Sequence, residues 1–230
     1  MHRLWPNCRI GFSMIGVIGC FFWWFWNEKP VPLPVCPHQT NQETVQEQMT
    51  EEQALQILIQ LGLQAIPAHQ QKEVLSSIAN QKIQYASSFQ QSSQSVSIQN
   101  VFSSSPVILH IWGTWCPPCR REIKELDVVL PQLKTGPSPI SCICVTNRDD
   151  SVETVTQFLR DHKLQSVNVG VDIHNGIIAS FQIHSFPQTF LFHANGQLVG
   201  RIIGTFPWQE PGVIEAIRIL LRAKTSVTTP

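Results

Sequence analysis

The chain has 230 residues, enough for one domain of ordinary size with an appendage. Its 16 basic and 16 acidic residues balance, so its charge indicates neither a nucleic-acid partner nor an acidic substrate. The seven cysteines have no even, regular spacing, which excludes a small domain held together mainly by disulfides. They are Cys8, Cys20, Cys36, Cys116, Cys119, Cys142 and Cys144.

The N-terminus has the pattern of a membrane segment. Arg3 and Arg9 precede an uncharged stretch, residues 10–26, which ends in the aromatic run Phe21–Trp26. A helix over this stretch is at the short end for crossing a bilayer. Positive residues before it favour a cytoplasmic location for residues 1–9, and the aromatic residues suit the far membrane interface. We predict an uncleaved transmembrane anchor over residues 10–26.

Two alternatives to the anchor remain open. Val17–Cys20 resembles a bacterial lipoprotein box, in which Cys20 would become a lipidated N-terminus, although large aromatic residues directly after the cysteine are unusual there. Cleavage as an ordinary signal peptide is the third reading, but no A-x-A-like site follows the stretch. All three readings place the remainder of the chain outside the cytoplasm.

Residues 27–40 are predicted to form a proline-rich linker. Such a segment favours extended polyproline geometry and would hold a domain away from the membrane. Cys36 within it is most simply an unpaired thiol, and an intermolecular disulfide is the alternative.

Residues 41–91 read as a helical segment with two apolar stripes. Thr50 and Gln53 form a capping-box pattern before the first stripe, and Pro67 suits the first turn of a second helix. The first stripe is Ala54, Ile57, Leu58 and Leu61, and the second is Val74, Leu75, Ile78, Tyr85 and Phe89. Two helices cannot bury such stripes alone. We expect them to pack on the next domain, with a homodimer through residues 41–91 as the alternative and the polar run 90–97 as a linker.

Residues 92–224 alternate between strand and helix patterns, followed by a tail, residues 225–230. The strands are expected at 107–112, 140–146, 167–171, 188–193 and 197–203, and the helices at 117–130, 151–162, near 175–181 and at 212–223. Pro131 and the Gly/Pro loop after it are expected to end the first helix. Asn195-Gly196 indicates a hairpin between the last two strands. This order predicts an α/β fold with a mixed sheet covered by helices.

The sequence Trp115-Cys116-Pro117-Pro118-Cys119 lies where the first of these strands leads into a helix. Two cysteines at this spacing can cycle between dithiol and disulfide, and a helix N-terminus favours the thiolate of the first. We predict that Cys116 is the accessible attacking thiolate. Cys119 shares the apolar helix face of Ile123 and should point inward, where it resolves the mixed disulfide.

A resemblance to a known family rests on four stretches. They are Ile111–Glu122, Ser185–Leu191, Asn195–Val199 and Gly204. Through them, residues from about 96 to 221 resemble the thioredoxin-like fold, most closely the TlpA/ResA/DsbE type. A zinc ribbon would need a second cysteine pair at suitable spacing, and Cys142-x-Cys144 lies instead on an apolar strand pattern, as expected for small buried side chains.

The resemblance implies further site residues. Pro187 matches the family's cis-proline beside the cysteines, and the backbone of Phe186 would pair with an extended substrate. Trp115 would pack beside the pair and shield it. His110 occupies a position where relatives carry an acid or Asn, so it is either a proton acceptor for Cys119 or a core histidine without a catalytic role. Glu122 is expected to stabilise the first turn of the helix.

The resemblance also implies a function. The protein would be a membrane-tethered periplasmic thiol–disulfide oxidoreductase of the bacterial inner membrane. It would reduce cysteine pairs of exported proteins, for example in cytochrome c maturation, and be recharged by a membrane electron donor. A disulfide oxidant or isomerase and a copper-delivering binding module are the alternatives. No metal and no cofactor besides the Cys116–Cys119 disulfide are expected, and His162, His174, His184 and His193 are assigned no role.

Overall fold

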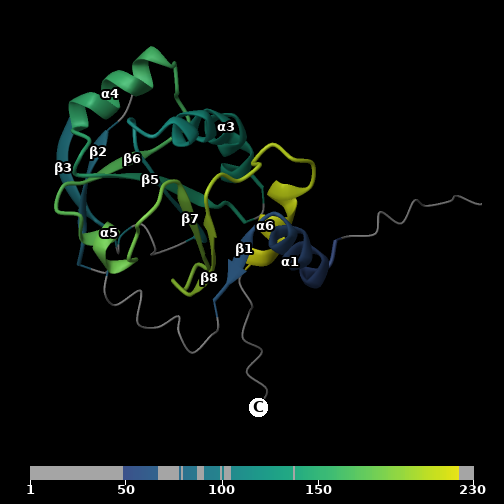
Figure 1. The fold of residues 1–230 in the computed structure, drawn as a ribbon. Helices are drawn as coiled ribbons and strands as arrows, with labels where there is room; N and C mark the ends of the chain where they lie inside the picture. The colour runs from purple at the N-terminus through teal and green to yellow at the C-terminus, as the bar shows by residue number, and fades with distance from the viewer. Residues whose placement is uncertain are drawn as a thin grey trace, which may run out of the picture. The chain divides into compact units, whose positions relative to one another are not determined.

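The computed structural model describes residues 49–66, 78, 80–86, 91–98, 100, 105–136 and 138–222 (Figure 1). The chain divides into two compact units, Met1–Gln46 and Glu47–Pro230, and the described residues all belong to the second. The predicted anchor, the lipoprotein box and the proline-rich linker lie outside them. No helix among the described residues combines the length and apolar character that a membrane crossing requires.

One mixed sheet of eight strands forms the centre of the second unit. The order across it is β1-β8-β7-β4-β5-β6-β2-β3, with β4, β5 and β6 parallel and the remaining neighbours antiparallel. The strands are β1 (Leu63–Ala65), β2 (Lys82–Ala86), β3 (Gln91–Ser97), β4 (Val107–Trp112), β5 (Ser141–Asn147), β6 (Val169–Asp172), β7 (Gln188–Phe192) and β8 (Leu198–Ile203). The helices with described bounds are α1 (Glu51–Gln60), α3 (Pro117–Lys134), α4 (Val152–Asp161), α5 (Gly176–Ser180) and α6 (Val213–Leu221).

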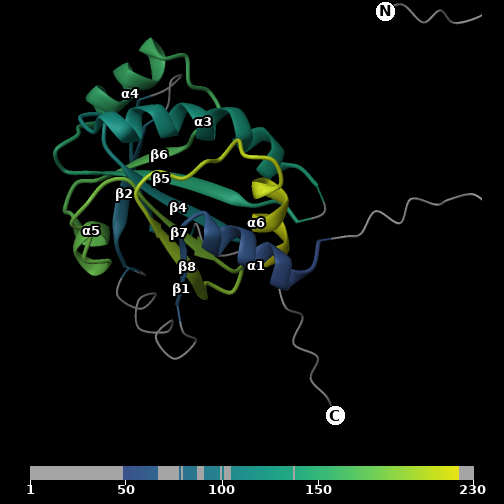
Figure 2. The same cartoon turned by 45° about the vertical axis from the view of Figure 1, so that its right-hand side comes forward.

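Strand β4 is the central strand and all six of its residues are buried. Alternate side chains point to opposite faces of a strand. Ile108 and Trp112 accordingly join the core beneath α1, α3, α4 and α6, whereas Leu109 and Ile111 join a second core that includes residues of α5 (Figure 2). The prediction of a mixed sheet covered by helices, in a thioredoxin-like α/β fold, is confirmed.

The first predicted helix of the N-terminal segment is confirmed as α1. Thr50 caps it as a capping box: the Thr50 hydroxyl accepts from the Gln53 N–H at 3.2 Å, and the Gln53 side chain accepts from the Thr50 N–H at 2.7 Å. Ala54 and Leu58 are fully buried, and α1 packs against α6. The first apolar stripe is therefore covered by the following part of the same chain, as expected.

The prediction of helix is wrong for residues 82–86, whereas most of the second predicted stripe lies outside the described residues and Ile78 is helical. Tyr85 lies on β2, which pairs with β6, and the expected linker at residues 90–97 contains β3. These two strands lie at one edge of the sheet, so few of their side chains need to be apolar. Ile83 is buried and lies directly over Gly170 of β6, where an added Cβ would be 2.6 Å from Ile83 Cδ1.

Helix α3 is longer than predicted, because it continues through Pro131 to Lys134. A proline inside a helix costs about 3 kcal/mol, since it removes one backbone hydrogen bond and crowds the preceding turn. Leu133, beyond the proline, is fully buried and continues the stripe of Leu126 and Leu130. Burial of such a leucine contributes roughly 1.5–3 kcal/mol and offsets much of that cost.

Candidate redox site

Cys116 and Cys119 form a disulfide where β4 leads into α3, with their Cα atoms 5.3 Å apart. Cys116 is the N-cap residue of the helix, and its N–H donates to the carbonyl of Gly113 at 3.2 Å, which closes a tight turn. Cys119 is fully buried, as predicted. Cys116 is only 4% exposed, so the prediction of an accessible first thiol does not hold for this oxidised form. Both sulfurs lie within the apolar core below α3.

The start of α3 gives the Cys116 sulfur a limited set of hydrogen-bond donors. The N–H of Cys119 points to Cys116 Sγ at 3.4 Å. Pro117 and Pro118 occupy the first two helical positions and carry no N–H. A side chain at the N-cap is normally met by the N–H of the second or third helical residue. Because the second is Pro118, the N–H of Cys119 is the donor that remains to hold a thiolate on Cys116, together with the positive end of the helix dipole.

The loop before β7 lies against the cysteine loop. The peptide bond between Phe186 and Pro187 is cis, which confirms the conformation predicted for Pro187. The rings of Phe186 and Trp115 meet edge to face, with centroids 5.1 Å apart. Trp115 also folds back over Gly113, where an added Cβ would be 2.8 Å from the indole. The Trp115 side chain remains 49% exposed, so it forms an apolar rim beside the disulfide.

His110 is fully buried on β4, opposite Thr189 of β7. Its Nδ1 shares a hydrogen bond of 3.0 Å with the Thr189 hydroxyl, and its Nε2 has no partner among the described residues. Burial lowers the pKa of His110 to about 3, so the ring is neutral at ordinary pH. The imidazole meets the edge of the Trp208 ring, with centroids 6.5 Å apart.

Glu122 has a different place from the one predicted. It is 2% exposed and bonds to the segment between β8 and α6: its Oε1 accepts from the Phe206 N–H at 3.1 Å and from Trp208 Nε1–H at 2.8 Å. Burial raises the pKa of Glu122 to about 7. Its Oε2 has no partner in the described part of the chain. Glu122 and His110 thus approach the same tryptophan from two elements.

The sequence contained a signal for the position of Glu122. It lies three residues after Cys119 and beside Ile123, on the side of α3 that the apolar stripe buries. A charged residue at such a position is a candidate buried acid.

A second acid, which was not assigned to the site from the sequence, supports the cysteine loop directly. Asp150, in the turn after β5, is 4% exposed. Its Oδ2 accepts from the Thr114 N–H at 2.9 Å, and its Oδ1 accepts from the Thr114 hydroxyl. Because β4 and β5 are parallel, the segments that follow them lie side by side at the carboxyl ends of the two strands. An acid in the turn after the strand that follows the cysteine strand was therefore the sequence signal that could have identified Asp150.

Comparison with known proteins agrees with this site. The profile of the AhpC/TSA family matches residues 79–201, more than half of the chain. The chain belongs to the AhpC/TSA family. The region matched extends from just before β2 through most of β8, and therefore includes the disulfide, His110, Asp150 and Pro187.

Two named relatives of this AhpC/TSA-family chain are thiol–disulfide exchange proteins. It is 30% identical over 98 residues to "Thiol-disulfide oxidoreductase ResA" of Bacillus cereus, covering 43% of this chain and 54% of the relative. It is 30% identical over 116 residues to "Thiol:disulfide interchange protein DsbE" of Vibrio cholerae, covering 49% and 59%. The chain thus spans little more than half the length of each relative. The resemblance to the ResA and DsbE type is confirmed.

A solved structure supports the fold. The structure of MTB dsbF in its mixed oxidized and reduced forms has a TM-score of 0.50 with this AhpC/TSA-family chain, at 14% identity. The match covers 63% of this chain and 97% of that protein. At this identity the likeness establishes the thioredoxin-like fold alone.

Cys142 and Cys144 are separate from the disulfide in this AhpC/TSA-family chain. Both are free and buried on β5, in agreement with their prediction as small core residues on one face. A hydrogen bond to Cys142 and burial raise the pKa of the Cys144 thiol. A thiol held protonated in this way is a poor nucleophile.

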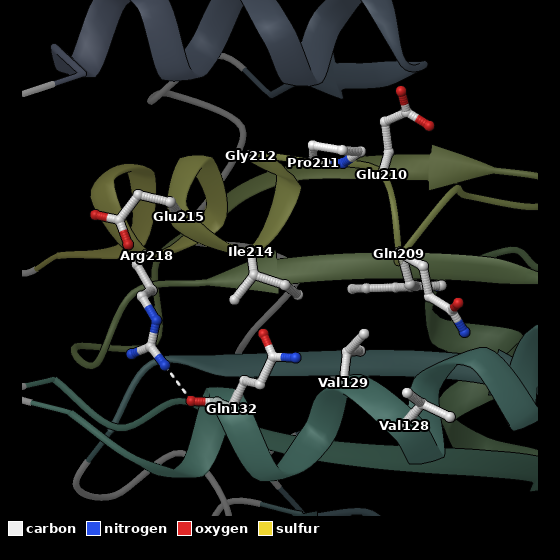
Figure 3. A pocket seen from close by; sticks show the side chains of 11 residues that line it. Val128, Val129, Gln132, Gln209, Glu210, Pro211, Gly212, Ile214, Glu215 and Arg218 are labelled. Atoms are coloured by element: carbon white, nitrogen blue, oxygen red, sulfur yellow. Dashed lines mark hydrogen bonds between the residues drawn. The ribbon is translucent and has the colours of Figure 1, made fainter. Parts of the chain in front are cut away.

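A groove of about 500 Å³ lies between the second half of α3 and the segment leading into α6 (Figure 3). Val128 and Val129 form one wall and Ile214 another, and the Arg218 guanidinium donates to the carbonyl of Gln132 at one end. No cysteine lines it. Trp208, the partner of Glu122, also lines it. The groove supplies none of the groups that thiol exchange needs.

Proposed function

We propose that this protein is a thiol–disulfide oxidoreductase that exchanges electrons with cysteine pairs of other proteins through Cys116 and Cys119. The observation that carries the proposal is the closed disulfide at the N-terminus of α3, beside the cis-Pro187 loop. The names of the ResA and DsbE relatives support the same activity.

The reduced site would act in two steps. The Cys116 thiolate attacks one sulfur of a client disulfide, a mixed disulfide forms, and the other client sulfur leaves as a thiolate. Cys119 then loses its proton and attacks Cys116, which closes the Cys116–Cys119 disulfide and releases the second client sulfur. Two electrons pass to the client, and the two client thiolates take up two protons. The N–H of Cys119 and the helix dipole favour the thiolate that begins this sequence.

The client would bind at the rim formed by Trp115 and Phe186. In the thioredoxin-like family the backbone before the cis-proline pairs with an extended substrate, and Phe186 occupies that position here. The bulk of Phe186 and its contact with Trp115 favour clients with an apolar side chain beside the cysteine.

We place this activity in the periplasm, as a reductant tethered to the inner membrane. The arginines before the uncharged stretch 10–26 favour that orientation, and the alternative is a lipid on Cys20. A membrane electron donor would return the disulfide to the dithiol. Clients would be exported proteins with cysteine pairs, including apocytochrome c. An oxidant or isomerase is the competing direction.

A trapping experiment tests the activity and names the client. In Cys119→Ser, Cys116 can attack a client disulfide but cannot release it, so a mixed disulfide accumulates and mass spectrometry identifies the attached protein. Cys142→Ser is the matched control, because its thiol is buried and takes no part in the Cys116–Cys119 disulfide. We expect adducts for the first variant only and, for the unaltered protein, reduction of insulin disulfides by dithiothreitol at an increased rate. Equal adducts with Cys142→Ser, or no adducts and no insulin reduction, would reject the proposal.

The redox state in cells tests the direction. Trapping free thiols in intact cells should find Cys116 and Cys119 mainly as the dithiol if the protein is a reductant. A pair found as the disulfide would assign the protein to the oxidants instead.

A further inference from the structure

We propose that Asp150 is a positioning residue of the redox site: acting through Thr114, its carboxylate fixes the turn that carries Cys116 and thereby makes the disulfide easier to close. This inference rests on the proposed thiol–disulfide exchange. It assigns a role to a residue outside the Cys-x-x-Cys motif and outside the cis-proline loop.

The first support is the geometry of the contact. Both oxygens of one carboxylate bind one residue: Asp150 Oδ2 accepts from the Thr114 N–H at 2.9 Å and Oδ1 accepts from its hydroxyl. Two bonds to one residue fix its orientation as well as its position. Asp150 itself is fixed, since it is 4% exposed and its N–H donates to the carbonyl of Asn147 at 3.1 Å.

The second support is the place of Thr114 in the chain. It lies inside the turn that the Cys116 N–H closes onto the carbonyl of Gly113. Within that turn, Trp115 occupies the space above Gly113. The two bonds from the Asp150 carboxylate to Thr114, called the clamp below, therefore fix the residue directly before Trp115 and Cys116. Asp150 itself follows β5, the strand beside β4.

The consequence concerns the two thiols of the reduced protein. A disulfide closes readily when its two sulfurs are held within reach of each other, because little conformational freedom is then lost on closure. Cys119 is fixed by the buried face of α3. Cys116 lies at the end of the loop, so the clamp on Thr114 decides how well its sulfur is held. Loosening the loop should favour the dithiol.

The experiment measures the equilibrium of the full-length protein with reduced and oxidised glutathione. We expect Asp150→Ala, which removes both bonds, to make the disulfide about tenfold easier to reduce, which corresponds to a change of about 30 mV. Thr114→Val keeps the bond from the Thr114 N–H and should produce part of that change. Asp150→Asn keeps an acceptor for the Thr114 N–H and should restore most of the difference. The double variant Asp150→Ala with Thr114→Val should shift no further than Asp150→Ala alone, because Asp150→Ala already removes both bonds to Thr114.

The control is Asp127→Asn. The Asp127 carboxylate also anchors a loop, accepting the N–H groups of residues 165–167 at 2.6–3.0 Å, but this loop precedes β6, at the opposite end of the parallel strands. We expect this variant to lower the free energy of unfolding without changing the glutathione equilibrium.

The outcomes separate the alternatives. If Asp150→Ala lowers only the free energy of unfolding, Asp150 is merely structural and the inference is wrong. It is also wrong if Asp150→Asn shifts the equilibrium as far as Asp150→Ala while Thr114→Val has no effect, since the charge and not the clamp would then matter. The measurement needs no client, so failure of the unaltered protein to reduce insulin would reject the proposed function and leave this comparison intact.

Discussion

Two buried ionisable side chains near the disulfide, His110 and Glu122, respond to pH in opposite directions. The pKa of His110 is lowered to about 3, so below pH about 6.5 this imidazole is protonated in the unfolded chain and still neutral in the folded chain. The pKa of Glu122 is raised to about 7, so above pH about 4.5 the unfolded chain loses a proton that the folded chain keeps. His110 therefore destabilises the fold as pH falls, and Glu122 destabilises it as pH rises. Because the two effects oppose each other, each residue's contribution to the pH dependence of stability is measured by comparison with a variant that lacks that residue.

Glu122→Gln should stabilise the protein at high pH. The amide keeps an oxygen for the Phe206 N–H and the Trp208 indole, and it removes the cost of ionising a buried acid. The stability that the neutral carboxyl provides is complete below pH about 4.5 and is lost as pH rises through about 7. Urea unfolding should show a gain of roughly 2–3 kcal/mol over the unaltered protein at pH 8 and little difference at pH 4. The exposed Glu210→Gln should show no such trend, and a gain independent of pH would contradict this account.

His110→Asn should remove a loss of stability in acid. Stability due to the neutral imidazole is complete above pH about 6.5 and is lost as pH falls toward about 3, amounting to about 2 kcal/mol between pH 7 and pH 5. Urea unfolding of the variant should lack this part of the pH dependence. The pH profile of insulin reduction distinguishes the two roles of His110: a profile unchanged by the substitution identifies a core histidine, and a shifted profile identifies a proton acceptor for Cys119.

At the scale of an element, the start of α3 decides the chemistry of Cys116. The helix supplies a positive end, while its first two residues, Pro117 and Pro118, supply no N–H. The thiolate is therefore stabilised by one backbone donor, the N–H of Cys119, where two could be present. A site of this kind should hold its disulfide more firmly than the same helix with a second donor.

Pro118→Ala adds that second donor without lowering the helix propensity. A hydrogen bond to a charged group contributes about 1.5–3 kcal/mol. The pKa of Cys116 should fall, and the glutathione equilibrium should shift about tenfold toward the dithiol, or about 30 mV. Thiolate absorbance against pH and the equilibrium with glutathione check both effects. Pro131→Ala, in the same helix, is the control and should leave both values unchanged. If it shifted the glutathione equilibrium as far as Pro118→Ala does, the cause would be helix stability and not the added donor.

At the scale of the whole molecule, the segment before the predicted thioredoxin-like domain is built into the same sheet and cores as that domain. β1 pairs with β8, α1 packs against α6, and β2 and β3 extend the opposite edge of the sheet. Leu58 of α1 belongs to the same buried cluster as Cys116 and Cys119. The residues from α1 to α6 should therefore unfold together.

Leu58→Ala tests this unity. Leu58 is fully buried, and removing such a side chain costs about 2–5 kcal/mol. The loss should appear in a single transition, with tryptophan fluorescence and far-ultraviolet circular dichroism changing together. Ile59→Ala, at a position 42% exposed on the same helix, should cost much less. Two separate transitions would show that α1 is an independent appendage.

The sequence by itself determined the elements whose patterns are local and strong. β4, α3 and α4, the hairpin of β7 and β8, and the pairing of Cys116 with Cys119 were all predictable, because alternation, helical stripes, caps and the Cys-x-x-Cys spacing involve residues close in the chain. The conformation of Pro187 followed from the family resemblance. Tertiary structure alone decided the rest. β2, predicted as helix, is a strand because β6 offers it a free edge, and β3, predicted as a linker, pairs in turn with β2. Thr114 contacts Asp150, 36 residues later in the chain, and Glu122 contacts Trp208, 86 residues later. Such contacts exist only once the sheet has brought distant segments together.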